Sequence, residues 1–193
     1  NQDAADKGKA YTEMLLNKAL KRGRMSEEKK AAILDRITAT VDANALQGCD
    51  LIIEAVFENV DLKHAMTKEL EPLLAEGGVW GSNTSTLPIT LLAEASAKPD
   101  NFIGIHFFSP VDKMPLVEII VGEKTSPETL AKAFDYSQQI KKTPIVVNDS
   151  RGFFTSRVFG TFVDEGAVLI EEGVEPVLIE NLAKLVGMPV GPL

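Results

Sequence analysis

The sequence is poor in cysteine and has no long apolar run. Cys49 is the only cysteine among 193 residues, so no internal disulfide can form, and a reducing cytoplasmic setting is expected. A lone cysteine can also be a nucleophile, but Cys49 stands in a Gln-Gly-Cys-Asp turn with no histidine nearby. No apolar run approaches the roughly 18 residues of a membrane span. No cationic and then apolar leader opens the chain. We therefore expect neither a membrane span nor secretion.

Positive charge is also scarce, since the net charge is −8. A general nucleic-acid binder needs a basic face to replace phosphate counterions, so this sign argues against that role. The one basic cluster comprises Lys18, Lys21, Arg22 and Arg24. At helical spacing it is either a solvated face or a contact for a phosphate-bearing small ligand.

Strand and helix patterns alternate through most of the chain. Short apolar strands are predicted at 51–56, 79–82, 102–106, 116–121 and 143–147, with helices at 4–22, 26–37, 60–74, 88–96 and 126–140. Strands that are apolar throughout indicate a parallel sheet covered by helices on both faces. Helices at 152–172 and 176–186 follow with no strand between them. We therefore predict an α/β domain over residues 1–147 and the beginning of an all-helical domain over 148–193.

The two histidines differ in their surroundings. His64 lies on a polar helix face and is interpreted as a surface residue, whereas His106 ends the apolar strand Phe-Ile-Gly-Ile-His. Sites in α/β folds gather at such strand ends. Glu118 lies within the apolar strand Leu-Val-Glu-Ile-Ile, where a carboxylate is costly unless it is paired. If residues 109–115 turn the chain back, Glu118 lies beside His106 and orients it as a general base. A core histidine or a purely structural ion pair are the alternatives.

Small polar side chains follow another strand. Residues 82–86, Ser-Asn-Thr-Ser-Thr, stand at the carboxyl end of the strand predicted at 79–82. Such side chains can bind a ligand oxygen, although the same residues also form ordinary turns and helix caps.

Several blocks together resemble a known family. They are IIEAVFEN at 52–59, SNTSTLPI at 82–89, HFFSPVDKMPLVEII at 106–120, NDSRGFF at 148–154 and GMPVGP at 187–192. They resemble the 3-hydroxyacyl-CoA dehydrogenases of fatty-acid β-oxidation, and most closely the branch within multifunctional β-oxidation proteins. The resemblance implies a Rossmann-like doubly wound sheet and NAD-dependent oxidation of (3S)-hydroxyacyl-CoA thioesters to 3-ketoacyl-CoA.

The resemblance also implies roles for catalytic residues. His106 matches the acid/base that takes the proton of the 3-hydroxyl as hydride leaves for the nicotinamide, and Glu118 matches its orienting partner. Ser85 matches the serine that hydrogen-bonds the reacting oxygen, between substrate and cofactor. Ser156 stands where many relatives carry an active-site Asn, which implies a position near the substrate.

Cofactor contacts are implied in the same way. Glu58 and Lys63 match positions near the ribose and nicotinamide of NAD, and Ser109 stands where several relatives have a cofactor-site Asn. Arg151 replaces a usual Pro. The basic cluster falls where the family places its CoA contacts.

One family feature is absent from the sequence. The family begins with a strand and a G-x-G-x-x-G loop, which binds the cofactor pyrophosphate at a helix N-terminus, and no such motif occurs here. We therefore expect a sheet without its first strand–helix–strand unit, and a chain that by itself lacks turnover and self-associates. A fused enoyl-CoA hydratase in the parent protein is a further expectation. The alternatives are another NAD-dependent hydroxy-acid dehydrogenase and a catalytically inert self-associating module.

Overall fold

The computed structural model describes residues 1–193 and divides into two compact units, residues 1–47 and residues 48–193. This division differs from the boundary predicted after residue 147. That boundary rests on the change from alternating strands and helices to helices alone, and it stays a prediction.

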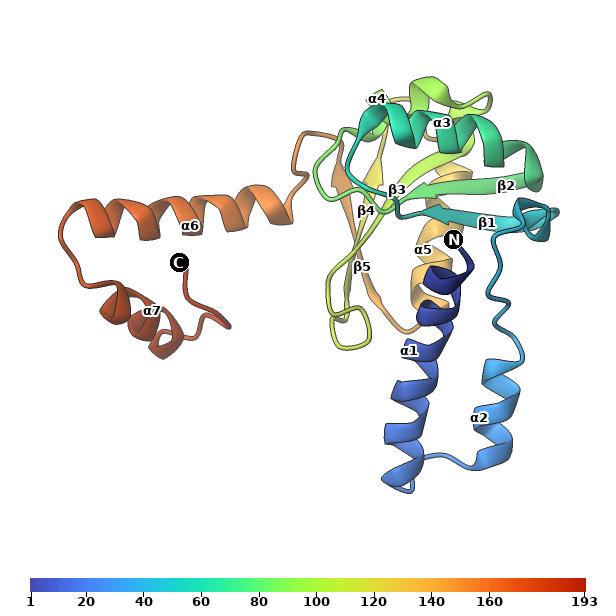
Figure 1. Cartoon of the computed structure of the whole chain (residues 1–193). Coiled ribbons are helices and arrows are strands. Elements are labelled where there is room, and N and C mark those ends of the chain that lie inside the picture. The colour runs from blue at the N-terminus through green and yellow to red at the C-terminus, as the bar shows by residue number, and fades with distance from the viewer. The chain divides into compact units, whose positions relative to one another are not determined.

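The first unit is a pair of helices, α1 (Gln2–Lys21) and α2 (Glu27–Leu34), followed by the 3₁₀ helix η1 (Ala43–Leu46). The Asn1 side chain caps α1, and the Ser26 hydroxyl accepts the Lys29 N–H at the start of α2. The two helices pack together (Figure 1), with an ion pair of 3.3 Å between Lys30 and Glu13. Helix α2 ends three residues before its predicted end at residue 37. The basic cluster of α1 is exposed, so both interpretations of it stay open.

The second unit is built on a five-stranded sheet. Its strands are β1 (Cys49–Glu54), β2 (Leu74–Ser82), β3 (Phe102–Phe107), β4 (Leu116–Val121) and β5 (Thr143–Asn148), and they lie in that order. All neighbouring pairs are parallel except β3 and β4. The sheet is therefore mostly parallel, as predicted, and the antiparallel pair of β3 and β4 is the turn of the chain considered above for residues 109–115. Residues 108–115 are too few for a crossover, which takes about a dozen residues or more, so the chain returns antiparallel.

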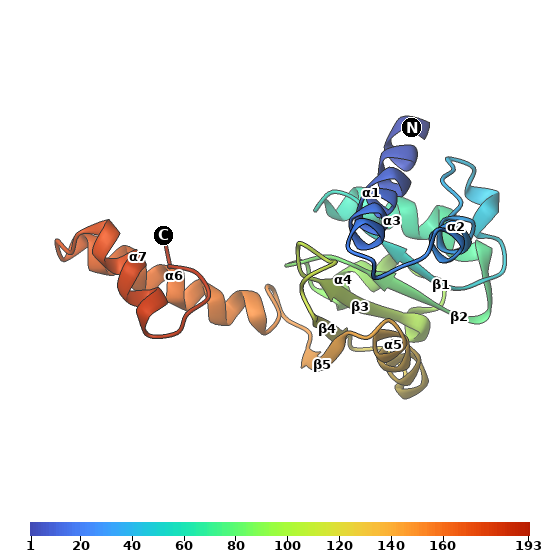
Figure 2. The same cartoon turned by 90° about the horizontal axis from the view of Figure 1, so that it is seen from below.

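Helices connect each pair of consecutive strands except β3 and β4. They are α3 (Val60–Leu70) with η2 (Glu71–Leu73), α4 (Ile89–Leu92) with η3 (Ala93–Ala95) and η4 (Pro99–Asn101), and α5 (Pro127–Gln139). Figure 2 shows α3 and α5 on opposite sides of the sheet. The predicted helix at 60–74 ends at residue 70, and β2 begins at residue 74 rather than 79. The sheet is therefore covered on both faces, as the apolar strands predict.

Alternation along β3 and β4 sorts their side chains between the two faces. Ile103, Ile105, Val117 and Ile119 form the core cluster with Ala133 of α5. Successive residues of a strand point to opposite faces, so Gly104, His106, Glu118 and Ile120 lie on the face away from α5. A Cβ on Gly104 would meet Ile120 and Ile89 side-chain atoms at 2.8 Å, which explains the glycine there. His106 and Glu118 therefore lie on the face of the sheet that α4 covers.

Two helices end the chain, α6 (Thr155–Glu171) and α7 (Pro176–Leu185), with no strand between them, as predicted. Helix α6 begins at residue 155 rather than 152, because Gly152 and Phe153 have left-handed φ angles of 77° and 48°. Both helices expose large apolar side chains, among them Val158, Phe159, Leu178, Leu182 and Leu185. None of the helices combines the length and apolar character needed to cross a membrane.

Candidate active site

His106 and Glu118 form a buried pair at the junction of β3 and β4. They are directly opposed in the antiparallel register, and His106 Nδ1 lies 2.8 Å from Glu118 Oε2. The His106 residue is 7% exposed and Glu118 is fully buried. The predicted contact is confirmed. Because a carboxylate only accepts hydrogen bonds, the proton between the two residues is on Nδ1, which leaves Nε2 as the nitrogen that can exchange a proton with a ligand.

Glu118 also binds the start of α6. Its Oε1 accepts the backbone N–H groups of Phe154 at 3.2 Å and Thr155 at 2.8 Å, and its Oε2 accepts the Thr155 hydroxyl at 2.8 Å. Burial raises the pKa of Glu118, but the hydrogen bonds from His106 and Thr155 outweigh burial, so that the pKa lies below its usual value. Glu118 is thus an anion that joins the histidine to a helix N-terminus, where negative charge is favoured.

A cavity of about 560 Å³ opens beside this pair. Its lining is largely apolar and comprises Phe108, Met114, Leu116, Phe154, Val158, Phe159, Phe162 and Met188, together with Ser85, His106, Thr155 and Ser156. The His106 ring is tilted against Phe108, with ring centroids 4.5 Å apart. The structure therefore brings His106, Ser85 and Ser156, which are far apart in the sequence, to one apolar cavity.

Glu58 organises the polar loop, defined here as residues 82–86. Its Oε1 accepts the Thr84 hydroxyl at 2.6 Å and the N–H groups of Ser85 at 2.8 Å and Thr86 at 3.1 Å. Burial raises the pKa of Glu58, yet these hydrogen bonds and Lys63 lower it more, to about 2. Glu58 therefore fixes the position of Ser85 through this hydrogen bond to its backbone N–H group.

Lys63 lies below this loop and is 1% exposed. Its Nζ lies 2.8 Å from Glu54 Oε1, 3.2 Å from the Val56 carbonyl oxygen and 3.5 Å from Glu58 Oε2. Glu54 Oε2 accepts the Ser82 hydroxyl at 2.8 Å. Sequence reasoning assigned no role to Glu54. A charged residue in an apolar strand, the signal that identified Glu118, could have found it.

Three further hydrogen bonds join the segment before α6 to the start of α4 and to the polar loop. Both carboxylate oxygens of Asp149 accept backbone N–H groups at 2.8 Å, from Ile89 and Thr90 at the start of α4. The Gly152 N–H donates to the Thr86 carbonyl oxygen at 3.0 Å. Asp149 lies in the NDSRGFF block, for which the sequence alone indicated no structural role. The segments that carry Ser85 and Thr155 are thus held together around His106.

One predicted residue lies elsewhere than expected, and a second is untested. Ser109 is exposed and does not line the cavity that contains His106, and its expected contact with the cofactor stays a prediction. His64 was predicted to be a surface residue but is half-buried, with Nε2 3.0 Å from the Leu91 carbonyl oxygen. Helix packing between α3 and α4 accounts for this, because it covers the face on which His64 lies.

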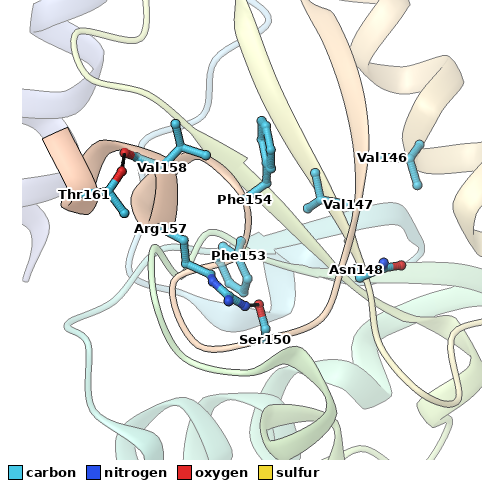
Figure 3. Close-up of a pocket in the computed structure, with 9 residues that line it drawn as sticks. All are labelled: Val146, Val147, Asn148, Ser150, Phe153, Phe154, Arg157, Val158 and Thr161. Atoms are coloured by element: carbon cyan, nitrogen blue, oxygen red, sulfur yellow. Dashed lines mark hydrogen bonds between the residues drawn. The ribbon is translucent and has the colours of Figure 1, made fainter.

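A second cavity of about 610 Å³ is lined by residues of β5 and of the first turns of α6, among them Val146, Arg157 and Thr161 (Figure 3). Phe154 and Val158 line both cavities. Arg157 donates a hydrogen bond of 3.2 Å to the Ser150 hydroxyl in it. None of the predicted site residues lines this cavity, so the chemistry is assigned to the first one.

Comparison with known families matches both parts of the chain. Residues 1–150 match the family model described as "3-hydroxyacyl-CoA dehydrogenase, NAD binding domain", and residues 152–193 match "3-hydroxyacyl-CoA dehydrogenase, C-terminal domain". The chain belongs to the 3-hydroxyacyl-CoA dehydrogenase family. This family agrees with the resemblance that the block around His106 and Glu118 indicated.

Individual relatives agree with this family. A protein named fatty acid oxidation complex subunit alpha from Shewanella amazonensis is 40% identical over 196 residues. The match covers all of this chain but 28% of that relative's length. Among solved structures, (S)-3-hydroxybutyryl-CoA dehydrogenase PaaH1 from Ralstonia eutropha is 37% identical with a TM-score of 0.94, covering all of this chain and 69% of that one. The 3-hydroxybutyryl-CoA dehydrogenase from Escherichia coli K12 is 29% identical with a TM-score of 0.94, covering all of this chain and 41% of that one.

Proposed function

We propose that this chain carries the acid/base centre and acyl site of an NAD-dependent dehydrogenase that oxidises (3S)-hydroxyacyl-CoA to 3-ketoacyl-CoA in fatty-acid oxidation. The observation that carries the proposal is the buried His106–Glu118 pair at an apolar cavity that also contains the Ser85 hydroxyl. An uncharged base beside a small hydroxyl donor suits removal of a proton from a secondary alcohol.

In this mechanism His106 Nε2 takes the proton of the substrate's 3-hydroxyl, and Glu118 stabilises the imidazolium that forms. Ser85 lines the same cavity, and its hydroxyl donates to Glu58 Oε1 at 3.2 Å in the structure. In this mechanism the hydroxyl turns to donate its proton to the reacting oxygen, which keeps that oxygen directed at His106. NAD⁺, held by residues at the carboxyl ends of β1 and β2, would supply the acceptor for the hydride of C3. In the reverse direction His106 returns the proton to the oxygen of the 3-ketoacyl thioester.

The residues at the carboxyl ends of β1 and β2 fit the nicotinamide half of NAD. This edge of an α/β sheet is where nucleotide cofactors bind. Glu58 presents a partly exposed carboxylate there, and Lys63 holds Glu58 from below. Ser85 completes the set on the side of His106. Ser109 remains a candidate for a contact at the outer rim, where it is exposed.

The cavity lining supports an acyl substrate. Phe108, Phe159 and Phe162 and the two methionines of the cavity offer apolar surface to an alkyl chain, whereas a small polar hydroxy acid would leave that surface unused. Ser156 supplies a further hydroxyl beside the alkyl chain of the substrate. Substrates with an acyl group are therefore favoured over free hydroxy acids of low molecular weight.

A dehydrogenase assay of two proteins tests this proposal. The first is the chain alone. The second is a chimera in which a strand–loop–helix–strand segment with the G-x-G-x-x-G motif expected for the family is joined ahead of residue 1. We expect the chimera to reduce NAD⁺ with (3S)-hydroxybutyryl-CoA and longer thioesters, and to be far slower with the free 3-hydroxy acids. Equal rates with the free acids would favour the alternative hydroxy-acid dehydrogenase. A chimera that binds NADH without turnover of any thioester would contradict the proposal and favour an inert module.

We also propose that the chain self-associates through α6 and α7. Apolar side chains such as Leu178, Leu185 and Val186 are 49%, 80% and 78% exposed, and exposed apolar patches of this kind favour association. Light scattering would measure the mass in solution. A monomer at micromolar concentration would contradict self-association.

A further inference from the structure

The Thr155 side chain meets the acid/base pair from the α6 side. Its hydroxyl donates a hydrogen bond of 2.8 Å to Glu118 Oε2, and this oxygen is the one that lies 2.8 Å from His106 Nδ1. The two donors therefore share one acceptor atom, and Thr155 contacts Glu118 without contacting the proton that His106 exchanges.

Thr155 holds both oxygens of the carboxylate. Its backbone N–H donates to Oε1 at 2.8 Å, while its hydroxyl donates to Oε2. Two donors from one residue, one to each oxygen, fix the plane of the carboxylate as well as its position. Glu118 is fully buried, where a lost hydrogen bond costs more than in solvent, so each of these bonds affects the direction in which Oε2 faces His106.

Capping of α6 does not require this hydroxyl. The backbone N–H groups of Phe154 and Thr155 already donate to Glu118 Oε1, which satisfies two of the N–H groups at the start of the helix. The hydroxyl adds a bond at the other oxygen, on the side of the histidine. Its effect is therefore on the pair rather than on the helix.

We infer that the Thr155 hydroxyl is a positioning group that orients Glu118 towards His106 and limits how strongly Oε2 attracts the Nδ1 proton. The inference rests on the proposed role of His106 as the base. Sharing Oε2 between two donors weakens each hydrogen bond to it, so that the Nδ1–H group remains on the ring while Nε2 works on the substrate.

Nuclear magnetic resonance of the ¹⁵N-labelled full chain tests this inference. The sequence has only two histidines, so the ring signals of His106 are assigned by comparison with His106→Gln, and those of His64 serve as an internal reference. Thr155→Val removes the hydroxyl and keeps the shape, Thr155→Ala removes it with less bulk, and Thr155→Ser retains it. Circular dichroism establishes that each variant is folded.

We expect the Nδ1–H proton of His106 to move downfield in Thr155→Val and Thr155→Ala, because Oε2 then has one donor fewer. In Thr155→Ser the signal should stay at its wild-type position, and the His64 signals should stay unchanged in all variants. The pKa of Glu118 should rise in the first two variants, since one of the bonds that lower it is lost.

An unmoved or upfield His106 signal in folded Thr155→Val and Thr155→Ala would overturn the inference. A shift in Thr155→Ser as large as in Thr155→Val would do the same, because the hydroxyl would then not be the cause. The measurement needs neither cofactor nor turnover. Failure of the dehydrogenase assay and failure of this inference are therefore separate results.

Discussion

Replacing Glu118 with glutamine changes the charge of the pair and preserves its shape. Glu118 accepts four hydrogen bonds, one from His106, one from the Phe154 N–H and two from Thr155. A glutamine amide has one accepting oxygen and one donating nitrogen. If the oxygen keeps the backbone N–H groups of α6, the amide nitrogen faces His106 Nδ1. The ring must then accept at Nδ1 and carry its proton on Nε2, which removes the base.

The size of both effects follows from this geometry. Loss of the correct tautomer lowers the turnover number by about 10⁴-fold, as for the equivalent change in the serine-protease triad. Two of the four hydrogen bonds are lost or reversed, and hydrogen bonds to a charged group contribute about 1.5–3 kcal/mol each. After partial compensation we expect the free energy of unfolding to fall by about 2–4 kcal/mol.

The pH dependence has a defined sign. The pKa of Glu118 in the folded protein lies below its ordinary value of 4.5. Its contribution to stability is therefore complete above the ordinary value and is lost as the pH falls through the folded pKa. We expect the stability difference between wild type and Glu118→Gln to be constant near neutral pH and to shrink in acid.

Urea unfolding of the chain between pH 3 and 8 measures the stability, and initial rates of the chimera measure the turnover number. Glu76→Gln is the matched control, because Glu76 is exposed on β2, and such surface changes usually stay within about 0.5 kcal/mol. The reasoning is refuted if Glu118→Gln behaves like this control, or if the chimera keeps its rate with the variant.

The remaining predictions concern the base, the polar loop and the packing beneath the site. His106→Gln in the chimera should lower the turnover number at least about a hundredfold with little change in NADH affinity, and an active variant would remove His106 from the mechanism. Glu58→Gln should destabilise the chain fully above pH 4.5 and progressively less as the pH falls towards 2, because the pKa of Glu58 is about 2; a pH-independent difference in urea unfolding would contradict this. Gly104→Ala should cost about 1–3 kcal/mol in unfolding free energy, since its Cβ would lie 2.8 Å from Ile120. Gly8→Ala in α1, where no atom lies within 4 Å, is the control and should be neutral or stabilising.

Local pattern was enough to identify the elements and the central pair. Apolar runs with turn residues between them predicted all five strands, and helical spacing predicted the helices, because both depend on neighbours along the chain. Glu118 could be recognised for the same reason, since a carboxylate within an apolar strand has to find a partner, and His106 was the available one. The resemblance of the surrounding blocks then indicated the family.

The tertiary structure decided which partners the other polar residues have. The sequence indicated only that Glu58 matches a cofactor position. In the structure its carboxylate accepts hydrogen bonds from the polar loop, in which Ser85 lies 27 residues further along the chain. Thr155 gave no signal, because its partner Glu118 lies 37 residues earlier and comes within reach only when α6 starts above β4. Hydrogen bonds between distant segments are set by strand order and register, which no local pattern records, and these contacts hold the candidate site in shape.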